Sequence, residues 1–207
     1  MVSPGNTYVL DPEFSFYGPM GFDTGAFISN LLLNYVSQTV LSTSEDYVEW
    51  ILEQINIFWN TFHDEFLRLW NDPMEHTGDA FQRPLLHDVQ TMHLVQDQFM
   101  SSLLEETLGF TGMKMLRRIM GIAHVEDLEC IGDVELKAKC EKHGLEVAKE
   151  LIKNASLFTS IKAVTMMACD KKRLYWVADP KPTDEPAAST DVDVDDDADA
   201  DAGMAEI

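Results

Sequence analysis

Long amphipathic helical patterns dominate the sequence after residue 22 and leave little room for a sheet. In the longest of them, apolar side chains recur every three or four positions and form one stripe: Tyr47, Ile51, Ile55, Phe58, Phe62, Phe66 and Trp70. This period is typical of a helix that buries one face. Ser42-Thr43-Ser44-Glu45 has the spacing of a capping box. We therefore expect a helix from this segment to about Trp70, with the stripe in a core.

The rest of the chain predicts more helices and very few strands. Helical patterns cover residues 24–38, with Asp23 as the N-cap, then 85–108, 134–153 and 158–169, and Thr111 is expected to cap a short helix that carries Met113, Leu116, Ile119 and Met120. Residues 7–10 are typical of a short strand, and 172–177 of a strand or extended segment. The sequence therefore predicts a mainly α fold with one or two short N-terminal strands, which need pairing partners.

Acidic residues are concentrated at the C-terminal end of the chain. The formal net charge is −21 over 207 residues, and Lys181 to Ile207 alone hold ten acidic residues and one basic residue. Such a segment has too little apolar surface to fold. We therefore expect one domain over residues 1–178 and an acidic disordered tail over 179–207. The acidic balance also argues against nucleic acid as a partner, because phosphate backbones are bound by clustered Lys and Arg.

The sequence carries no sign of a membrane or secretory context. Its apolar runs are too short to cross a bilayer, and the N-terminus lacks the pattern of a signal peptide. The three cysteines, Cys130, Cys140 and Cys169, are odd in number and lack CxxC spacing, so they indicate neither a disulfide framework nor a zinc site. These features favour a cytoplasmic protein that does not contact a membrane.

Two carboxylates follow the predicted N-terminal strand, in the run Asp11-Pro12-Glu13. Asp11 and Glu13 are two residues apart, so both can reach one Mg²⁺ ion, which prefers oxygen ligands and is often shared with phosphates. The alternative is a turn, because Asp-Pro pairs often begin one and Glu13 can be solvated. A partly buried loop, in which unpaired carboxylates are costly, is suggested by the apolar neighbours Phe14, Phe16, Tyr17 and Met20. The pair is a candidate metal clamp for phosphoryl transfer.

Arg117 and Arg118 stand out in a part of the chain that is poor in positive charge. The guanidinium fork suits phosphates, carboxylates and vicinal hydroxyls. Adjacent helical residues point about 100° apart, so at most one arginine is expected to face a given site directly. The alternative is surface pairing with an acidic neighbour such as Glu126 or Asp127. The histidines form no catalytic or metal-binding signature and are interpreted as core or surface residues: His63, His87, His93 and His124.

Three blocks of the sequence resemble 5-methylthioribose kinase, a family of the protein-kinase-like superfamily. The first covers residues 9–23, including Asp11-Pro12-Glu13, and continues with Gly25-Ala26-Phe27 and Asn30-Leu31-Leu32-Leu33. The second consists of Leu108-Gly109-Phe110, Lys114-Met115-Leu116-Arg117-Arg118-Ile119 and residues 121–127. The third consists of Cys140-Glu141, Leu145-Glu146 and Ala148-Lys149. The resemblance covers about residues 1–165 and implies the helical C-terminal lobe of a protein-kinase-like fold.

The resemblance also implies roles for individual residues. The family's Asp-x-Glu pair binds Mg²⁺ and the ATP phosphates, which assigns metal binding to Asp11 and Glu13 and nucleotide binding to the whole Asp11-Pro12-Glu13 run. The family's twin arginines bind the methylthioribose substrate and match Arg117 and Arg118. The implied reaction transfers the γ-phosphoryl group of ATP to the anomeric hydroxyl of 5-methylthioribose, as a step of methionine salvage. It relies on positioning and charge neutralisation.

The sequence departs from the family in what precedes the Asp-Pro-Glu run. It contains no glycine-rich loop with an ATP-binding lysine and no His-Gly-Asp catalytic loop. We therefore expect a fragment that holds no catalytic residue of its own and is inactive alone. The alternative is a non-catalytic helical fragment that serves in interaction or dimerisation, because the resemblance implies a homodimer or pairing with a full-length kinase.

Overall fold

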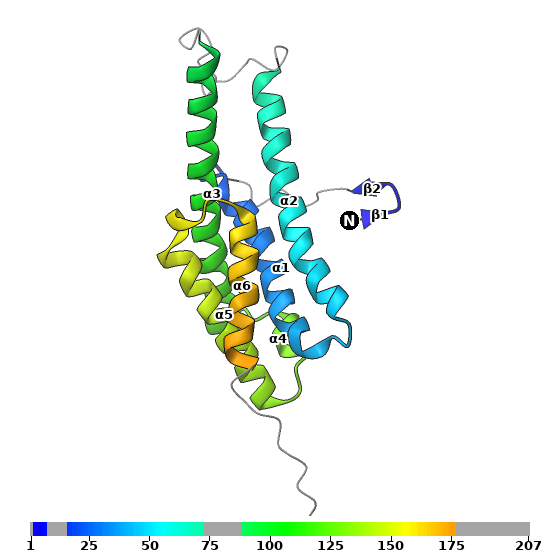
Figure 1. Cartoon of the computed structure of the whole chain (residues 1–207). Helices are drawn as coiled ribbons and strands as arrows, with labels where there is room; N and C mark the ends of the chain where they lie inside the picture. The colour runs from blue at the N-terminus through cyan, green and yellow to red at the C-terminus, as the bar shows by residue number, and fades with distance from the viewer. Residues whose placement is uncertain (1, 8–15, 73–87, 177–207) are drawn as a thin grey trace, which may run out of the picture.

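The computed structural model describes residues 2–7, 16–72 and 88–176, and most of these are helical (Figure 1). In chain order the elements are β1 (Val2–Ser3), β2 (Asn6–Thr7), α1 (Gly21–Leu41), α2 (Glu45–Asn71), α3 (Val89–Met120), α4 (Glu126–Glu129), α5 (Val134–Lys153), the 3-10 helix η3 (Ala155–Leu157) and α6 (Ile161–Trp176). The prediction of a mainly α fold with short N-terminal strands is confirmed. The acidic tail predicted over 179–207 falls outside the described residues and stays a prediction.

Helix α1 lies at the centre of the bundle and packs against α2, α3 and α5. Its buried residues belong to one apolar core with residues of α2, α3, α5 and α6, and this core includes Ile28, Leu32, Leu33, Val36, Ile55, Leu108, Met115, Val147, Leu151 and Val164. Helices α2 and α3 are longer than the others and project beyond them as a helical pair (Figure 1). Ring stacking between Phe66 and Phe99, with centroids 5.5 Å apart, joins the two helices.

The aromatic stripe predicted on α2 is confirmed for most of its length. Ile51, Ile55 and Trp70 are buried, and the phenylalanines between them are partly buried against the core. Tyr47 is the exception, since it is 42% exposed. The helix begins where the sequence predicted, with Ser44 as the N-cap residue that accepts a hydrogen bond from the Tyr47 backbone N–H (3.3 Å).

Helix α1 begins earlier than predicted, and Asp23 is not its cap. The N-cap residue is Met20, which makes no side-chain cap, and Asp23 lies in the first turn. The Gly21 backbone N–H instead donates to Glu106 Oε1 at 2.6 Å. A carboxylate from α3 therefore does what a local cap would do, since the first N–H groups of a helix need an acceptor. The predicted cap was wrong because the acceptor is far away in the sequence.

Helix α3 runs through Thr111 without a break, so the predicted short helix is wrong. The Thr111 hydroxyl is buried and bonds the carbonyl oxygens of Thr107 (2.8 Å) and Gly25 (3.3 Å). The neighbouring Gly112 serves close packing, because a Cβ there would lie 2.7 Å from the Ala148 carbonyl oxygen. These small residues let α1 and α5 approach α3 closely, and they do not end the helix.

The two ends of the chain differ in detail from the predictions. The strand predicted at residues 7–10 meets the described residues only at Thr7, which pairs with Val2 across a turn that holds Gly5 at φ 79°. The helix predicted at 134–153 is confirmed as α5. The last helix starts at Ile161 and continues to Trp176, so the extended segment predicted from Lys172 is wrong over its described part. Residues 161–176 contain no proline, so nothing in this stretch breaks the helix at Lys172.

The described helices include none long and apolar enough to cross a membrane.

Candidate functional site

The predicted metal clamp, Asp11-Pro12-Glu13, lies outside the described residues, so its role stays a prediction. Among the residues that the structure describes, no three His, Cys, Asp or Glu side chains group closely enough to hold a metal ion. The described chain resumes at Phe16, in the loop that leads into α1. Phe16, Tyr17 and Met20 are exposed there, so the prediction of a partly buried loop is wrong for these three residues.

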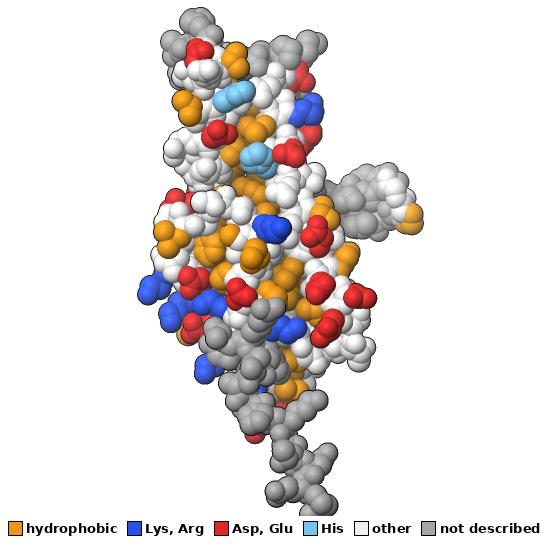
Figure 2. All heavy atoms as spheres, in the orientation of Figure 1, with side chains coloured by type: hydrophobic (Ala, Val, Ile, Leu, Met, Phe, Trp, Pro, Cys, Tyr) orange, Lys and Arg blue, Asp and Glu red, His pale blue; other side chains and the backbone are white. Residues whose placement is uncertain are grey.

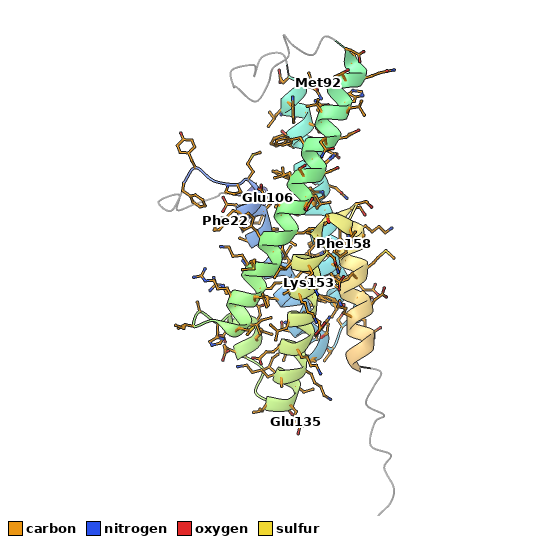
Figure 3. All side chains as sticks on the ribbon, turned by 90° about the vertical axis from the view of Figure 1, so that its left-hand side faces the viewer. Phe22, Met92, Glu106, Glu135, Lys153 and Phe158 are labelled. Atoms are coloured by element: carbon orange, nitrogen blue, oxygen red, sulfur yellow. The ribbon has the colours of Figure 1, made fainter. Side chains whose placement is uncertain are left out.

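The start of α1 is fixed against the middle of α3. Phe22 packs edge-to-face on Phe110 of α3, with ring centroids 5.4 Å apart, and on Phe16, at 5.2 Å. Figure 3 shows Phe22 beside the turn of α3 that carries Glu106, whose carboxylate accepts the Gly21 N–H. A second bridge joins the Thr24 and Thr107 hydroxyls at 2.9 Å. The residues that follow the predicted clamp are therefore held at one place on α3.

Lys114 connects this place to the twin arginines. Its Nζ atom lies 3.9 Å from the centroid of the Phe22 ring, a cation–π contact. Partial burial lowers the pKa of Lys114, the charges of Arg117 and Arg118 lower it further, and Asp23 acts in the opposite direction. Phe22, Asp23, Lys114 and the arginines therefore share one neighbourhood. Sequence reasoning missed Lys114, although its spacing of three and four residues from the arginines signals a shared helix side.

The two arginines have different surroundings at the C-terminal end of α3. Arg118 is half-buried, and its Nη1 donates to the Ala123 carbonyl oxygen at 3.2 Å. Arg117 is exposed. The expected pairing with Glu126 or Asp127 is absent from the described ion pairs, and the Asp127 carboxylate instead accepts a hydrogen bond from Asn34 Nδ2 (2.8 Å). Arg118 therefore braces the loop after α3, which leaves Arg117 as the more accessible guanidinium.

Among the described histidines, only His124 lies next to a residue of this site, since it follows Ala123, the partner of Arg118. His63 and His93 sit on the projecting helices, and His124 Nδ1 is 3.7 Å from Glu129 Oε1. His143 is fully buried, with Nε2 3.2 Å from the Ala168 carbonyl oxygen, and burial lowers its pKa below the usual value. His87 falls outside the described residues. The interpretation of the histidines as core or surface residues fits those that are described.

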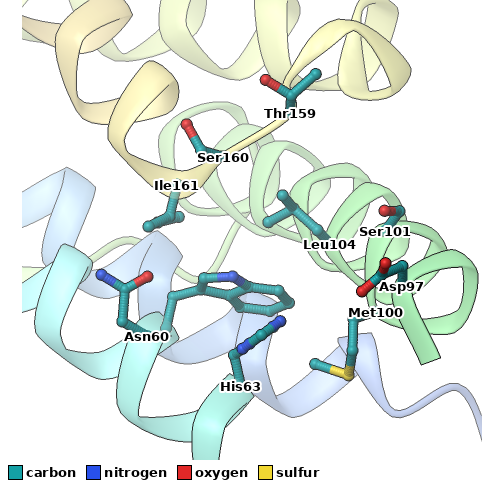
Figure 4. Close-up of a pocket in the computed structure, with 10 residues that line it drawn as sticks. Asn60, His63, Asp97, Met100, Ser101, Leu104, Thr159, Ser160 and Ile161 are labelled. Atoms are coloured by element: carbon teal, nitrogen blue, oxygen red, sulfur yellow. The ribbon is translucent and has the colours of Figure 1, made fainter. Parts of the chain in front are cut away.

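A separate cavity of about 300 Å³ lies between α2, α3 and the start of α6 (Figure 4). Figure 4 shows its polar rim, and the full lining is Trp59, Asn60, His63, Asp97, Met100, Ser101, Leu104, Thr159, Ser160 and Ile161. In Figure 2, hydrophobic atoms show in the seam between α2 and α3, with histidine side chains beside it. Neither Phe22 nor the cations of α3 line this cavity, so it is not part of the site at the start of α1.

Comparison with known proteins points to one enzyme family. No protein-family model matches the chain. The chain is 45% identical over 168 residues to methylthioribose kinase 2 of Oryza sativa subsp. japonica, and equally to methylthioribose kinase 1 of that organism, and each match covers 79% of this chain. It is 42% identical over 173 residues, 81% of this chain, to methylthioribose kinase of Escherichia coli O45:K1. This part of the chain belongs to the methylthioribose kinase family.

The matches cover less than half of each relative's own length. They cover 39% of each rice methylthioribose kinase and 41% of the Escherichia coli enzyme. The chain therefore spans about two fifths of the length of these curated relatives. The family resemblance read from the sequence blocks is confirmed.

Proposed function

We propose that the chain is the helical lobe of a methylthioribose kinase. The complete enzyme would transfer the γ-phosphoryl group of ATP to the anomeric hydroxyl of 5-methylthioribose and release 5-methylthioribose 1-phosphate. The observation that carries the proposal is the 45% identity over 168 residues with proteins named methylthioribose kinase. The cation-rich end of α3, beside the start of α1, supports it because phosphoryl transfer needs positive groups around the phosphates.

In this proposal the two parts of the site divide the work. Asp11 and Glu13 would hold Mg²⁺, because two carboxylates supply the oxygen ligands that this ion prefers. Bound Mg²⁺ would neutralise charge on the ATP phosphates. Arg117 and Arg118 would bind the sugar substrate, and Arg117 is the more exposed of the two guanidinium groups. The contacts of Phe22 and Gly21 with α3 hold the start of α1, which follows the clamp in the sequence, on the helix that carries the arginines.

The chain alone is expected to show no turnover, because the sequence lacks the glycine-rich loop and the His-Gly-Asp motif that the family resemblance implies. A coupled ADP-release assay with 5-methylthioribose tests this on the purified chain. The same assay is repeated after mixing with a second polypeptide that carries the unmatched part of the rice enzyme. Turnover that needs both polypeptides, and disappears with Asp11→Asn, supports the proposal. Turnover by the chain alone contradicts its inactivity, and a mixture that is folded and associated yet inactive contradicts the kinase assignment.

A second candidate function is non-catalytic interaction or dimerisation, and exposed apolar grooves favour it. One groove on α2 is lined by Ile57, Phe58, Thr61, Phe62, Glu65, Phe66 and Leu69. Another on α3 is lined by Thr91, Leu94, Val95, Gln98, Phe99 and Ser102. The stacked Phe66 and Phe99 rings join the two. Sedimentation of the chain, alone and with a full-length kinase, tests this function, and a monomer that ignores the kinase contradicts it.

A further inference from the structure

Three cations share one side of the C-terminal part of α3. At about 100° per residue, Arg117 lies about 60° to one side of Lys114 around the helix axis, and Arg118 lies about 40° to the other side. The two arginines therefore diverge, as the sequence predicted. Lys114 lies one turn earlier and between their directions. A single ligand near this turn can meet the lysine together with either guanidinium.

The cluster has little carboxylate to neutralise it. Across residues 16–72 and 88–176, none of the three cations forms an ion pair with an acidic side chain, whereas Lys137 and Lys171 do, at 2.9 Å and 3.2 Å. Both arginines act on Lys114 as repelling charges, and Asp23 is the acid that opposes them. The helix dipole stabilises cations only in the last turn, which excludes Lys114. A bound anion would offset the repulsion that the arginines exert on Lys114.

An aromatic ring holds the Lys114 ammonium in place. The Phe22 ring lies under Nζ and is itself packed against Phe110 of α3. A cation–π contact occupies one side of the ammonium and leaves donors on the other side for a ligand. The ring also ties the ammonium to the start of α1, directly after the loop that follows Glu13. The charge is thus fixed beside the start of α1, on the helix that carries the arginines.

We propose that Lys114, together with Arg117 and Arg118, binds the phosphate group of a small phosphorylated ligand, with Lys114 as the central contact. Phosphate oxygens are strong acceptors, and lysine binds them as a point charge while arginine binds them as a fork. The proposal rests on the proposed function for the class of ligand, which is a phosphorylated sugar. It adds Lys114 to the site as a phosphate-binding residue.

The test is a calorimetric titration of the whole chain with inorganic phosphate, at constant ionic strength and without Mg²⁺. Lys114→Met removes the charge but keeps a long apolar stem over Phe22. Lys162→Met, at an exposed position of α6, is the matched control. We expect Lys114→Met to weaken phosphate binding about fivefold or more, and Lys162→Met to leave it unchanged. Absence of saturable binding to the unaltered chain, or equal affinities of the two variants, would overturn the proposal.

A second measurement needs no variant and covers the case in which Lys114→Met does not fold. The unaltered chain is acetylated with and without phosphate, and the modification of Lys114 and Lys162 is followed by mass spectrometry. Protection of Lys114 but not Lys162 supports the site, and equal modification with and without phosphate overturns it. Neither measurement involves ATP or a second polypeptide. A failure here therefore leaves the ADP-release result standing, and a failure of the kinase assay leaves phosphate binding standing.

Discussion

Two glycines in helix interiors should respond to alanine with opposite signs. A Cβ at Gly25 of α1 would lie 2.7 Å from the Thr107 carbonyl oxygen, 2.8 Å from Phe110 Cβ and 3.0 Å from the Thr111 backbone nitrogen. A Cβ at Gly109 of α3 would meet nothing within 4 Å. The two substitutions therefore share the same gain in helix propensity and differ only in what the methyl group touches.

The expected magnitudes follow from these distances. Alanine stabilises a helix interior by about 1 kcal/mol relative to glycine, so Gly109→Ala should raise the free energy of unfolding by up to about 1 kcal/mol. At Gly25 the methyl group presses mainly on the backbone of α3, which cannot rotate away. Overpacking of this kind costs about 1–3 kcal/mol. Because the contacts at Gly25 are with fixed atoms, we expect the upper part of that range and a net loss of about 2 kcal/mol.

Urea unfolding followed by far-ultraviolet circular dichroism measures both effects, provided that the dependence on urea is the same in all three proteins. The reasoning is refuted if Gly25→Ala is as stable as the unaltered chain, because the seam between α1 and α3 would then yield without cost. It is also refuted if Gly109→Ala lowers stability as much as Gly25→Ala does. In that case general helix effects, rather than the close approach of the two helices, would explain the losses.

Two further predictions concern buried polar contacts. Burial lowers the pKa of His143 in the folded chain below its usual 6.5. As the pH falls, the imidazole is therefore protonated in the unfolded chain before it is protonated in the folded chain. The contribution of His143 to the free energy of unfolding is kept above about pH 6.5 and is lost as the pH falls below that value. His143→Gln should remove that part of the pH dependence of urea unfolding, and exposed His93→Gln should not. Glu106→Ala should cost about 1–2 kcal/mol in the same assay, because the Gly21 N–H loses its acceptor, whereas Glu106→Gln should cost less; equal losses would contradict the hydrogen-bond explanation.

The sequence predicted those helix ends whose signals are local. Asp133 accepts hydrogen bonds from the backbone N–H groups of Glu135 and Leu136, at 2.9 and 3.0 Å, and α5 begins where its pattern begins. Ser44 starts α2 in the same way. The failures at Asp23 and Thr111 have the opposite cause. The acceptor of the Gly21 N–H lies 85 residues away. The Thr111 hydroxyl bonds the Thr107 carbonyl of its own helix and also the Gly25 carbonyl, 86 residues away, so no short window of sequence contains the long-range partner of either residue.

The residues of the candidate site show the same difference between local and long-range signals. Arg117 and Arg118 were found from composition and from a resemblance, both of which are properties of a short segment. Lys114 acquires its place only when Phe22 comes to lie 3.9 Å from its ammonium, and that contact joins residues of two helices. The spacing of Lys114 from the arginines was visible in the sequence, but the ring that orients it was not.

The close seam between α1 and α3 links stability to ligand binding. Gly25 lies one turn after Phe22, so a methyl group that separates the helices at Gly25 also moves the Phe22 ring relative to Lys114. Gly109 faces open space, and alanine there changes stability without displacing α1. If the ring fixes the ammonium for phosphate, Gly25→Ala should weaken phosphate binding while Gly109→Ala should not, even though both variants stay folded in the absence of urea. Equal phosphate affinities of these two variants would show that Lys114 does not depend on the position of α1.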